Sequence, residues 1–492
     1  MTVLRELALP ELLVALPLLA ALVSLVQPSR PGLVLALSQG AQVACAVALA
    51  ATVWTGGPVA RAVGGWEPPL GIVLHADGLA TAFVLASTML MLGVGAFAHL
   101  SSELARVRGP GPFAFWPLFH LMAAALAVLF LSRDLFNLYV GLELLTISAV
   151  GMVALGSVAA ATRYLLFALM GSLAYLAGVV LFYAAAGTLD IDFLAASGGE
   201  PTVVGIGAAL VTAGLLVKTA LFPFHAWLPE AHGSAPAPAS ALLSALVVKA
   251  SFLILARLWF EILPDAGPDA LMQLLGLLGA CAVIYGSLLA LREDSLKRIV
   301  AYSTVAQLGY LFFVFPLAAV GGASEPIEAA GWSGAMIHAL SHAFAKSALF
   351  LCAGIVVTAR GGGTLEHMRG LARALPMTIT AFGLAAVSIM GLPPSGGFMA
   401  KYLMLTSALA QGKLALALVM LVGGLLAAIY LFRPLNAAMA RSDVPEIRPV
   451  PRSLELIALG LALVATLLGI FSAAPYEFLQ IGRPAITGEA IP

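Results

Sequence analysis

The chain has 492 residues, of which 61% are hydrophobic and only 10% are charged, and its formal net charge is zero. An ordinary soluble domain carries about a quarter charged residues. The apolar residues fall in runs of roughly 20, the length that spans a bilayer core of about 30 Å. The composition therefore excludes a soluble domain, gives no sign of a nucleic-acid partner, and predicts an all-α polytopic membrane protein.

Apolar runs separated by turn residues predict fourteen membrane spans. Span seven is interrupted at Pro223 and Pro229, and span twelve is interrupted by GLPPSGGF, Gly391 to Phe398. The other spans read as continuous helices. In chain order the predicted spans are 8–26, 32–54, 75–100, 113–131, 134–156, 162–186, 203–232, 238–262, 269–291, 299–319, 333–358, 375–411, 414–436 and 453–475.

The distribution of basic residues tests this count independently. If both termini lie on the outer side, the loops after odd-numbered spans are cytoplasmic, and they hold 14 of the 24 lysines and arginines. The opposite side holds six, and the remaining four are lysines inside spans. This asymmetry follows the positive-inside rule, so we expect an even number of spans with both termini outside.

The two interrupted spans are five apart, and this spacing predicts an internal duplication. Broken helices at corresponding positions of two halves indicate inverted repeats with a functional site between them. Spans 4–8 and 9–13 would form two such five-helix units. The predicted divisions are an N-terminal three-helix segment (1–110), a first repeat (111–263), a second repeat (264–440), and a C-terminal helix and tail (441–492).

Three cysteines lie far apart in apolar runs, and no CxxC or Cys/His spacing joins them: Cys45, Cys281 and Cys352. We therefore expect no iron–sulfur cluster, structural zinc or other cofactor held by this chain. The N-terminus MTVLRELALPELL has no basic segment and no small-residue cleavage site, so no cleaved signal peptide is expected.

Five charged residues lie well inside predicted spans: Glu143, Lys218, Lys249, Lys346 and Lys401. Each costs roughly 2.5–3.5 kcal/mol at a helix centre, so five unpaired charges would cost on the order of 12–17 kcal/mol, more than a typical folding stability. They are therefore expected to face one another, water or a polar helix break. A permanent buried ion pair and lysines that reach the membrane surface remain structural alternatives, although buried ion pairs stabilise weakly at best.

Glu143, ten residues into span five, is the expected partner of Lys218, which precedes the break at Pro223. At an effective dielectric constant near 20, a carboxylate about 4 Å from an ammonium contributes ~4 kcal/mol. Moving or neutralising Glu143 would therefore switch Lys218 between holding and releasing a proton. The break, flanked by His225 and His232, is expected to let water reach Lys218, and a kink made only for packing is the alternative.

Span eleven carries His338, His342 and Lys346 at i, i+4 and i+8, so the three side chains lie along one helix face. A proton relay is predicted, because histidine titrates near neutral pH and the stripe ends in a buried amine. A hydrogen-bonded structural stripe is the alternative. A metal pair is disfavoured, because no Glu follows the first His as in HExxH and no third ligand is evident.

Lys401 follows the second break, where Pro393 and Pro394 remove backbone hydrogen bonds. Freed backbone groups at membrane depth must be satisfied by protein or water, so a water-filled cavity beside Lys401 is expected. Charged residues at the ends of spans are expected to be interfacial rather than catalytic, and Arg133 and Asp134 are expected to pair there. The other interfacial residues are His75, Asp77 and Glu103.

Five stretches together resemble the antiporter-like subunit family shared by respiratory complex I, membrane-bound hydrogenases and Mrp-type sodium/proton antiporters. They cover most of residues 113–438 in consistent order. The resemblance implies fourteen helices with inverted repeats, Glu143 and Lys218 as a modulating ion pair, Lys249 as the central relay, and Lys401 as the terminal proton site. The stretches are DLFNLYVGLELLTIS, KTALFPFHAWLPEAHGSAPAPASALLSALVVK, EDSLKRIVAYSTVAQLGY, HALSHAFAKSALF and GLPPSGGFMAKY.

Within this family, the segment GGWEPPLGIVLHAD (Gly64 to Asp77) is similar to the D subunit of Mrp-type antiporters. This implies a proton-translocating subunit of a multisubunit Na⁺/H⁺ antiporter in a bacterial cytoplasmic (inner) membrane, with other membrane subunits as partners. One departure is Arg163, where the family often has lysine; arginine stays charged at any accessible pH, so Arg163 is kept out of the relay. Asp190 replaces a common asparagine, with little consequence expected.

Two other classes of function remain open. The same channel would serve as a pump module of complex I or an energy-converting hydrogenase, with the redox chemistry carried by other chains. A solute permease or structural membrane subunit is the third class, and it predicts that removing the buried charges leaves transport intact.

Overall fold

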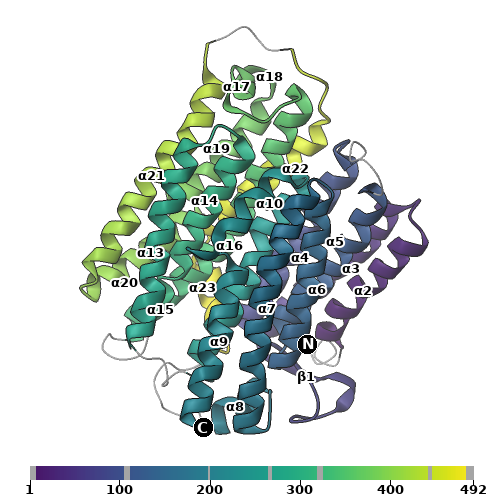
Figure 1. The fold of residues 1–492 in the computed structure, drawn as a ribbon. Coiled ribbons are helices and arrows are strands. Elements are labelled where there is room, and N and C mark those ends of the chain that lie inside the picture. Colours follow the sequence, from purple (N-terminus) through teal and green to yellow (C-terminus); the bar gives the residue numbers. More distant parts are fainter. Residues whose placement is uncertain are drawn as a thin grey trace.

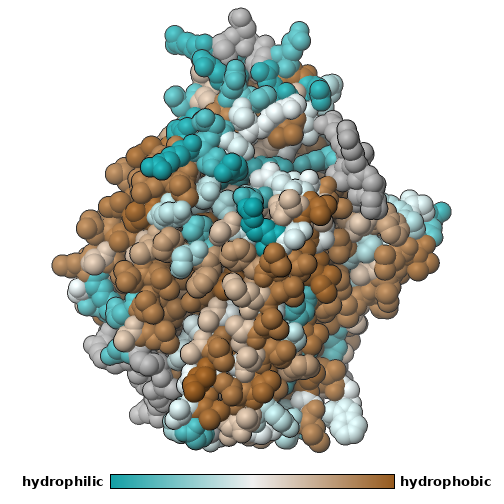
Figure 2. Space-filling view, in the orientation of Figure 1, coloured by the Kyte–Doolittle hydropathy of each residue, from teal (hydrophilic) through white to brown (hydrophobic). Residues whose placement is uncertain are grey.

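The computed structural model describes residues 7–104, 111–197, 200–263, 269–318, 325–441 and 446–483. Long helices stand side by side through the body of the molecule (Figure 1). Thirteen helices within these residues are long and apolar enough to cross a membrane. The visible surface is hydrophobic over its middle, and hydrophilic residues gather at its two ends (Figure 2).

The N-terminal segment contains three long helices and a β-hairpin: α2 (Leu9–Val26), α3 (Pro31–Gly56), β1 (Val59–Ala62), the 3₁₀ turn η1 (Val63–Gly65), β2 (Val73–Ala76) and α4 (Gly78–Leu100). The all-α prediction missed the hairpin, in which Val59 pairs with Ala76 and Ala62 with Val73. Leu74 and Ala76 alternate inward and are buried, as expected for a strand with one covered face.

Residues 111–262 follow as α5 (Gly111–Leu131), α6 (Leu135–Ala154), α7 (Val158–Ala186), α8 (Ile191–Ser197), α9 (Pro201–Thr219), η3 (Phe224–Trp227), α10 (Leu228–Ser234), α11 (Ala237–Leu242), η4 (Leu243–Val247), α12 (Val248–Arg257) and η5 (Leu258–Ile262). Residues 269–480 form α13 (Asp269–Arg292), α14 (Leu296–Leu311), α15 (Val314–Ala318), α16 (Glu325–Arg360), α17 (Leu365–Met368), α18 (Leu371–Ala374), α19 (Pro376–Met390), α20 (Gly396–Ala410), α21 (Leu414–Met439), α22 (Arg452–Ile470) and α23 (Ala473–Gln480).

Both predicted interruptions are present. Span seven consists of α9, η3 and α10, and span twelve consists of α19 and α20. The thirteen candidate spans do not include span twelve, whose first half, α19, is too short to be counted, so the number of fourteen spans stays a prediction. The division into two repeats, and their inverted relation, stay predictions.

Two other spans depart from the expectation of continuous helices. Span eight contains two π-helical turns, η4 and η5, on either side of α12. Span ten is interrupted between α14 and α15. Neither irregularity contains the proline or glycine cluster that marks spans seven and twelve, and π-turns depend on how neighbouring helices pack rather than on a local sequence signal.

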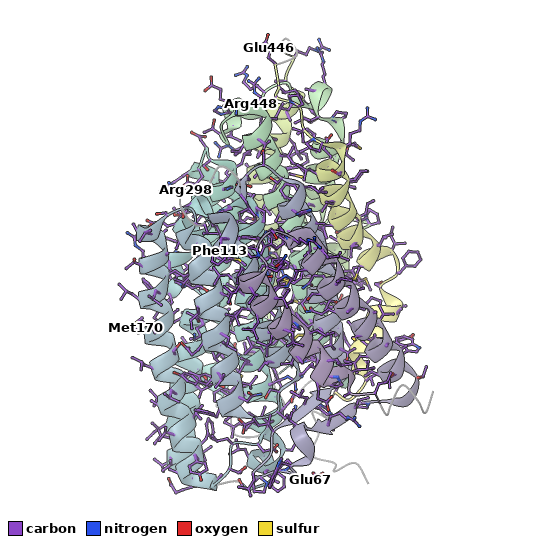
Figure 3. All side chains as sticks on the ribbon, turned by 90° about the vertical axis from the view of Figure 1, so that its right-hand side faces the viewer. Glu67, Phe113, Met170, Arg298, Glu446 and Arg448 are labelled. Atoms are coloured by element: carbon purple, nitrogen blue, oxygen red, sulfur yellow. The ribbon has the colours of Figure 1, made fainter. Side chains whose placement is uncertain are left out.

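The two ends of the described chain lie at the same end of the molecule. Glu11, in the first turn of α2, pairs with Arg61 of β1 at 3.5 Å. The carbonyl oxygen of Ile481 accepts a hydrogen bond from the Gly78 amide at 2.8 Å, where α4 begins. Both contacts are at the hairpin end, near Glu67, whereas Arg298 lies toward the opposite end (Figure 3). This placement agrees with an even number of crossings.

Three spans form the centre of the bundle. Ala237–Ile262 is completely enclosed over its most apolar stretch, and Leu296–Ala318 and Ala329–Arg360 are 94% buried over theirs. In six flanking helices, less than half of the most apolar stretch of each helix is buried: α2, α3, α7, α13, α21 and α22. The span that carries Lys249 and the span that carries His338, His342 and Lys346 therefore lie inside the bundle, together with α14.

Small residues let α7 and α9 approach closely, as is common between membrane helices. A Cβ atom at Gly214 would lie 2.4 Å from the carbonyl oxygen of Gly171, and one at Gly178 would lie 2.5 Å from that of Gly207. This contact fixes the position of the last turn of α9, which carries Lys218.

Gly214→Ala should lower the thermal stability of the protein. The added methyl group forces two backbones apart, and overpacking of this kind costs about 1–3 kcal/mol. Gly205→Ala is the matched control, because it lies on the same helix with nothing within 4 Å of the new Cβ atom. Thermal unfolding of the two variants in detergent checks the prediction, and equal melting temperatures would contradict it.

Candidate functional site

Glu143 of α6 and Lys218 of α9 form the ion pair expected from the sequence. The Lys218 Nζ atom lies 3.3 Å from Glu143 Oε1 and 3.0 Å from the hydroxyl of Thr146. Ser172 of α7 donates a further hydrogen bond to the same carboxylate oxygen. The Lys218 side chain is 6% exposed and that of Glu143 is 24% exposed, so the carboxylate is the member of the pair that faces outward.

The break after Lys218 is stabilised by protein groups. Ala220 adopts a left-handed conformation with φ of 57°, and this residue ends α9. The Val217 carbonyl oxygen accepts hydrogen bonds from the Ala220 amide at 3.1 Å and from the Trp227 indole at 3.2 Å. Trp227 stacks on Tyr164 of α7 with ring centroids 4.1 Å apart. The backbone groups released by the break are therefore partly satisfied by a side chain of the following turn.

A small cavity of about 10 Å³ adjoins Lys218. Its walls include Thr146, Tyr164, Lys218 and Ser251, so it extends from α9 to the span that carries Lys249. This volume is enough for about one water molecule. The hydroxyls of Thr219 and Ser251 lie 3.0 Å apart and join the same two helices.

Lys249 lies next to the π-helical turn η4. Its side chain is completely buried, and its ammonium donates to the carbonyl oxygen of Ser244 within that turn. The Ser244 hydroxyl lies 2.8 Å from the hydroxyl of Thr304 on α14. The wide turn thus supplies a carbonyl acceptor to an ammonium that has no carboxylate partner among the described residues.

The three predicted residues of α16 are all buried and share one face. The Lys346 ammonium donates to the Val300 carbonyl oxygen of α14 at 2.8 Å, and His338 Nε2 lies 3.3 Å from the Gln307 carbonyl oxygen. The His338 and His342 rings stack with centroids 5.8 Å apart. His338 Nδ1 and His342 Nε2 have no hydrogen-bond partner within the described chain, and buried polar atoms of this kind are usually satisfied by water.

Lys401 of α20 reaches back to the other half of the divided span. Its ammonium donates to the carbonyl oxygens of Ile389 and Met390 at 2.9 and 3.2 Å, and it lies 4.4 Å from the centroid of the Tyr310 ring. The ammonium itself therefore satisfies the carbonyl groups released at the break. The water-filled cavity expected beside Lys401 remains a prediction.

Gly391 makes this contact possible. It ends α19 with φ of 82°, and a Cβ atom there would lie 2.5 Å from Lys401 Cδ. Gly391→Ala should therefore displace the ammonium and lower both proton flux and thermal stability, with a cost of about 1–3 kcal/mol. Gly383→Ala on the same helix meets nothing nearer than 3.9 Å and should leave both measurements unchanged; equal behaviour of the two variants would contradict the argument.

The structure separates the two histidines that flank the first break. His232 of α10 is completely buried, stacks on Phe350 of α16 at 5.0 Å, and lies within electrostatic range of Lys249 and Lys346. His225 of η3 lies against Phe222 and Tyr285 instead. His232 therefore adjoins the central lysines, whereas His225 is at the periphery of the set.

The predicted pair of Arg133 and Asp134 is wrong. Asp134 caps α6, where its carboxylate accepts a hydrogen bond from the Asn137 amide at 2.7 Å. Arg133 instead forms ion pairs with Asp192 of α8 and Glu261 of η5. Asp134 stays at the N-terminus of α6 because a helix N-terminus favours a carboxylate. The two acidic partners of Arg133 lie far along the chain, so the sequence around Arg133 does not indicate them.

Sequence reasoning also missed the extension of this network. Arg257 lies 3.2 Å from Glu261 and 3.3 Å from Asp77, which caps α4. Arg257 is one of the six basic residues that the charge partition places on the outer side, and the structure shows it 4% exposed inside span eight. It lies about 12 Å along the helix from Lys249, and the intervening residues 252–256 are apolar, so this network is separate from the lysine and histidine set.

Two further ion pairs lie at the other end of the bundle. Glu103 pairs with Lys297 at 3.6 Å and accepts a hydrogen bond from the Ala237 amide at 3.0 Å, where α11 begins. Arg163, excluded from the relay on sequence grounds, pairs with Glu230 at a half-exposed position. Within the described residues no group of three or more His, Cys, Asp or Glu side chains could hold a metal ion.

Comparison with known proteins identifies the family. The model of the family described as NADH:quinone oxidoreductase/Mrp antiporter, TM, matches residues 132–427, which is more than half of the chain. The chain belongs to this family. The match includes all nine predicted site residues, and it confirms the resemblance seen in the sequence motifs and the integral membrane character.

Related proteins come from two kinds of complex. The N subunit of the NADH-quinone oxidoreductase of Desulforudis audaxviator is 36% identical over 461 residues, covering 90% of this chain and 89% of the relative. The D subunit of the Na⁺/H⁺ antiporter of Bacillus subtilis is 30% identical over 385 residues, covering 77% of this chain and 75% of the relative. The predicted association with other membrane subunits fits both relatives.

Solved structures confirm the fold class. A chain of the Mrp complex from Dietzia sp. DQ12-45-1b superposes with a TM-score of 0.86 at 28% identity, covering 97% of this chain and 96% of that one. A chain of respiratory complex I from Thermus thermophilus superposes with a TM-score of 0.73 at 26% identity, covering 95% of this chain and 98% of that one.

Proposed function

We propose that this chain moves protons through the membrane along its buried Glu143, Lys218, Lys249, Lys346, His342, His338 and Lys401. The observation that carries the proposal is that these four lysines and two histidines are buried. Of these four lysines, only Lys218 has a carboxylate partner within the described residues. Such charges are costly at membrane depth and mark ion pathways when they are retained. His232 adjoins this route, and His225 stands outside it.

At one end of the proposed proton route, Glu143 controls whether Lys218 holds its proton. Because its carboxylate is the more exposed member of the pair, a neighbouring subunit can reach it and change its distance from Lys218. Loss of a carboxylate at about 4 Å removes ~4 kcal/mol of attraction for a proton on the lysine. The proton then passes through the water-sized cavity and the Thr219 and Ser251 hydroxyls toward Lys249.

The second part of the proposed proton route runs through the centre of the helix bundle, from Lys249 to Lys401. Ser244 and Thr304 join Lys249 to α14, and Thr304 donates to the carbonyl oxygen of Val300 at 3.1 Å. The same carbonyl oxygen holds the ammonium of Lys346. The two stacked histidines then continue along α16 toward Lys401, which lies within electrostatic range of both rings.

The first candidate for the parent complex is an Mrp-type Na⁺/H⁺ antiporter in a bacterial cytoplasmic membrane. Support comes from the similarity to the Bacillus subtilis antiporter protein and from the superposition on the Dietzia Mrp complex. In this setting the partners are the other antiporter subunits, and proton movement through this chain drives Na⁺ movement elsewhere in the complex.

The second candidate is a respiratory complex of the complex I type. The specific observation in its favour is the match to an NADH-quinone oxidoreductase protein over 90% of this chain. In this setting redox subunits supply the movement that changes the Glu143–Lys218 pair, and this chain supplies one proton channel.

Vesicles that contain the purified, assembled complex test the proposal and separate the candidates. A Na⁺ gradient alone should move protons if the complex is an antiporter, whereas NADH and a quinone should do so if it is an oxidoreductase. Subunit identification by mass spectrometry provides the parallel check. Proton movement that persists after Lys218→Ala under either driving force would refute the proposed route.

A further inference from the structure

The helix face of α16 that carries the histidine stripe continues beyond Lys346. Phe350 and Gly354 follow Lys346 at i+4 and i+8, so the three positions lie along one face at steps of about 6 Å. His232 of α10 stacks on Phe350 with ring centroids 5.0 Å apart. Glu103, which follows α4, lies beside Gly354, where a Cβ atom would be 3.5 Å from Glu103 Oε2. Along this face, His232 therefore lies between Glu103 and Lys346.

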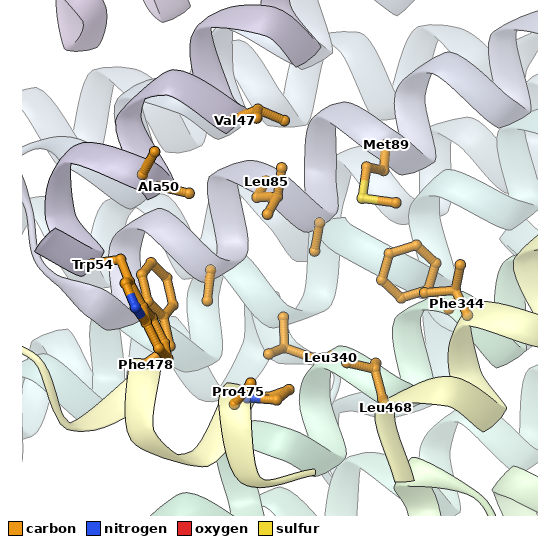
Figure 4. A pocket seen from close by; sticks show the side chains of 15 residues that line it. Val47, Ala50, Trp54, Leu85, Met89, Leu340, Phe344, Leu468, Pro475 and Phe478 are labelled. Atoms are coloured by element: carbon orange, nitrogen blue, oxygen red, sulfur yellow. The ribbon is translucent and has the colours of Figure 1, made fainter. Parts of the chain in front are cut away.

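The opposite side of α16 is apolar. Leu340 and Phe344 point into a pocket between α3, α4, α16, α22 and α23 (Figure 4), and none of the described residues that line this pocket is charged. Phe344 is two residues from Lys346, which is a rotation of about 200° around the helix. A proton can therefore reach Lys346 along the face that Glu103 and His232 share, and not through this pocket.

Glu103 and His232 both have buried polar atoms without a hydrogen-bond partner among the described residues. These atoms are Glu103 Oε2 and the two ring nitrogens of His232. Buried polar atoms of this kind are usually satisfied by water. The Glu103 side chain is 18% exposed, whereas His232 is completely buried. The two groups therefore lead from a position that solvent can reach to the interior of the bundle.

The first turn of α14 brings Glu103 close to the site that holds Lys346. Lys297 in this turn pairs with Glu103 at 3.6 Å. Val300, three residues farther along, provides the carbonyl oxygen to which the Lys346 ammonium donates. Three residues rise about 4.5 Å along a helix, so the ion pair is within one helical turn of that carbonyl group. Arg298, the neighbour of Lys297, lies toward the end of the molecule opposite the hairpin (Figure 3).

We propose that Glu103 is the residue through which the proton route exchanges protons with water at the Arg298 end of the bundle. This inference rests on the proposed function. The Glu103 carboxylate takes a proton from water. Neutral His232 accepts that proton at one ring nitrogen and releases the proton that the other nitrogen carries, and the neutral amine of Lys346 binds it as an ammonium. One water molecule in each gap of about 6 Å connects the three groups, and protons leave by the same steps in reverse.

The position of Glu103 suits this exchange. The sequence predicts an interfacial place for Glu103, and exchange with bulk water has to occur at the membrane boundary. Lys297 acts as a positioning residue that holds the carboxylate against α14. The structural alternative is that Glu103 only caps α11, where it accepts a hydrogen bond from the Ala237 amide at 3.0 Å.

The first test measures proton flux of Glu103→Gln in vesicles that contain the assembled complex. The amide oxygen of glutamine can still accept the hydrogen bond from Ala237, but the side chain cannot bind and release a proton. Flux should fall by about tenfold or more, as expected when a proton-transfer group is lost. Formate is a small weak acid that can carry protons to a site left without its carboxylate, and it should restore most of the lost flux.

Glu293→Gln is the matched control. The Glu293 side chain is 19% exposed and pairs with Arg298 at the same end of the bundle, so this variant should keep wild-type flux. Lys218→Ala reports the leak that formate itself causes, and formate should restore nothing beyond that leak. Wild-type flux in Glu103→Gln, or a loss that formate leaves unchanged, would overturn the inference about Glu103. Normal flux in Lys218→Ala would instead refute the proposed proton route.

The second test uses the wild-type complex and so does not depend on the folding of a variant. A carbodiimide reacts with a carboxyl group that carries a proton, because the proton moves to a nitrogen of the reagent as the carboxyl oxygen bonds to its carbon. Peptide mass spectrometry should find this adduct on Glu103 in preference to Glu293. Labelling of Glu103 that is absent, or no stronger than that of Glu293, would overturn the proposal.

Discussion

Glu143→Gln should abolish proton flux through the assembled complex, with a loss of at least about tenfold, because the change removes a charge that contributes ~4 kcal/mol to the adjacent ammonium. Glutamine retains nearly the same shape and can still accept the hydrogen bonds of Ser172 and Lys218. The loss would therefore report the charge rather than the packing. Proton uptake into vesicles, followed with a pH-sensitive dye, provides the measurement.

Glu230→Gln is the control for this experiment. Glu230 also pairs with a basic residue, Arg163, but both side chains are half exposed, and exposed pairs contribute little. The control should retain most of the flux, as should Arg163→Lys. Normal flux in Glu143→Gln, with the complex assembled at wild-type levels, would show that the ion pair is only structural.

Lys249→Arg should also reduce flux by about tenfold or more, although it keeps the positive charge. Arginine remains protonated at any accessible pH, so it cannot accept and release a proton within a transport cycle. A permanent structural charge, by contrast, would be supplied by arginine as well as by lysine. This substitution therefore distinguishes a relay residue from a fixed cation more sharply than removal of the charge.

Because Lys249 is completely buried, the larger guanidinium group also tests the packing around it. Lys249→Met, which has similar length and no charge, separates the two effects: it should fold and assemble but conduct no better than Lys249→Arg. Flux near the wild-type level in either variant would place the proton route elsewhere. Assembly is followed by native gel electrophoresis of the solubilised complex.

The features of the fold that depend on composition and strong local signals could be predicted from the sequence. Apolar length indicated the spans, and the prolines at 223, 229, 393 and 394 indicated the two divided helices. The π-helical turn beside Lys249 could not be predicted, because it needs the ammonium, Ser244 and Thr304 to meet across two helices. The hairpin was missed because each strand has only four residues.

In the candidate site, too, residues with a strong local sequence signal could be predicted, and contacts between distant elements could not. Glu143, Lys218 and the α16 stripe were recognisable, because a charge or a histidine repeat in an apolar run has few structural explanations. The positions of His225 and His232 relative to Lys249 depended on how the first break folds back, which the local sequence does not encode. Arg257 was counted with the six basic residues of the outer side because it lies near a predicted span end. Its partner Glu261 is only four residues away, but Asp77 comes from a distant part of the chain.

The enclosure of Ala237–Ile262 has a consequence for biogenesis. This segment carries Lys249 and Arg257, and insertion of two such residues into lipid would cost roughly 5–7 kcal/mol. Their surroundings are provided by Asp77, synthesised long before, and by α14 and α16, synthesised afterwards. The segment therefore has to wait beside the translocon, or cross only loosely, until the ribosome has delivered the helices that surround it.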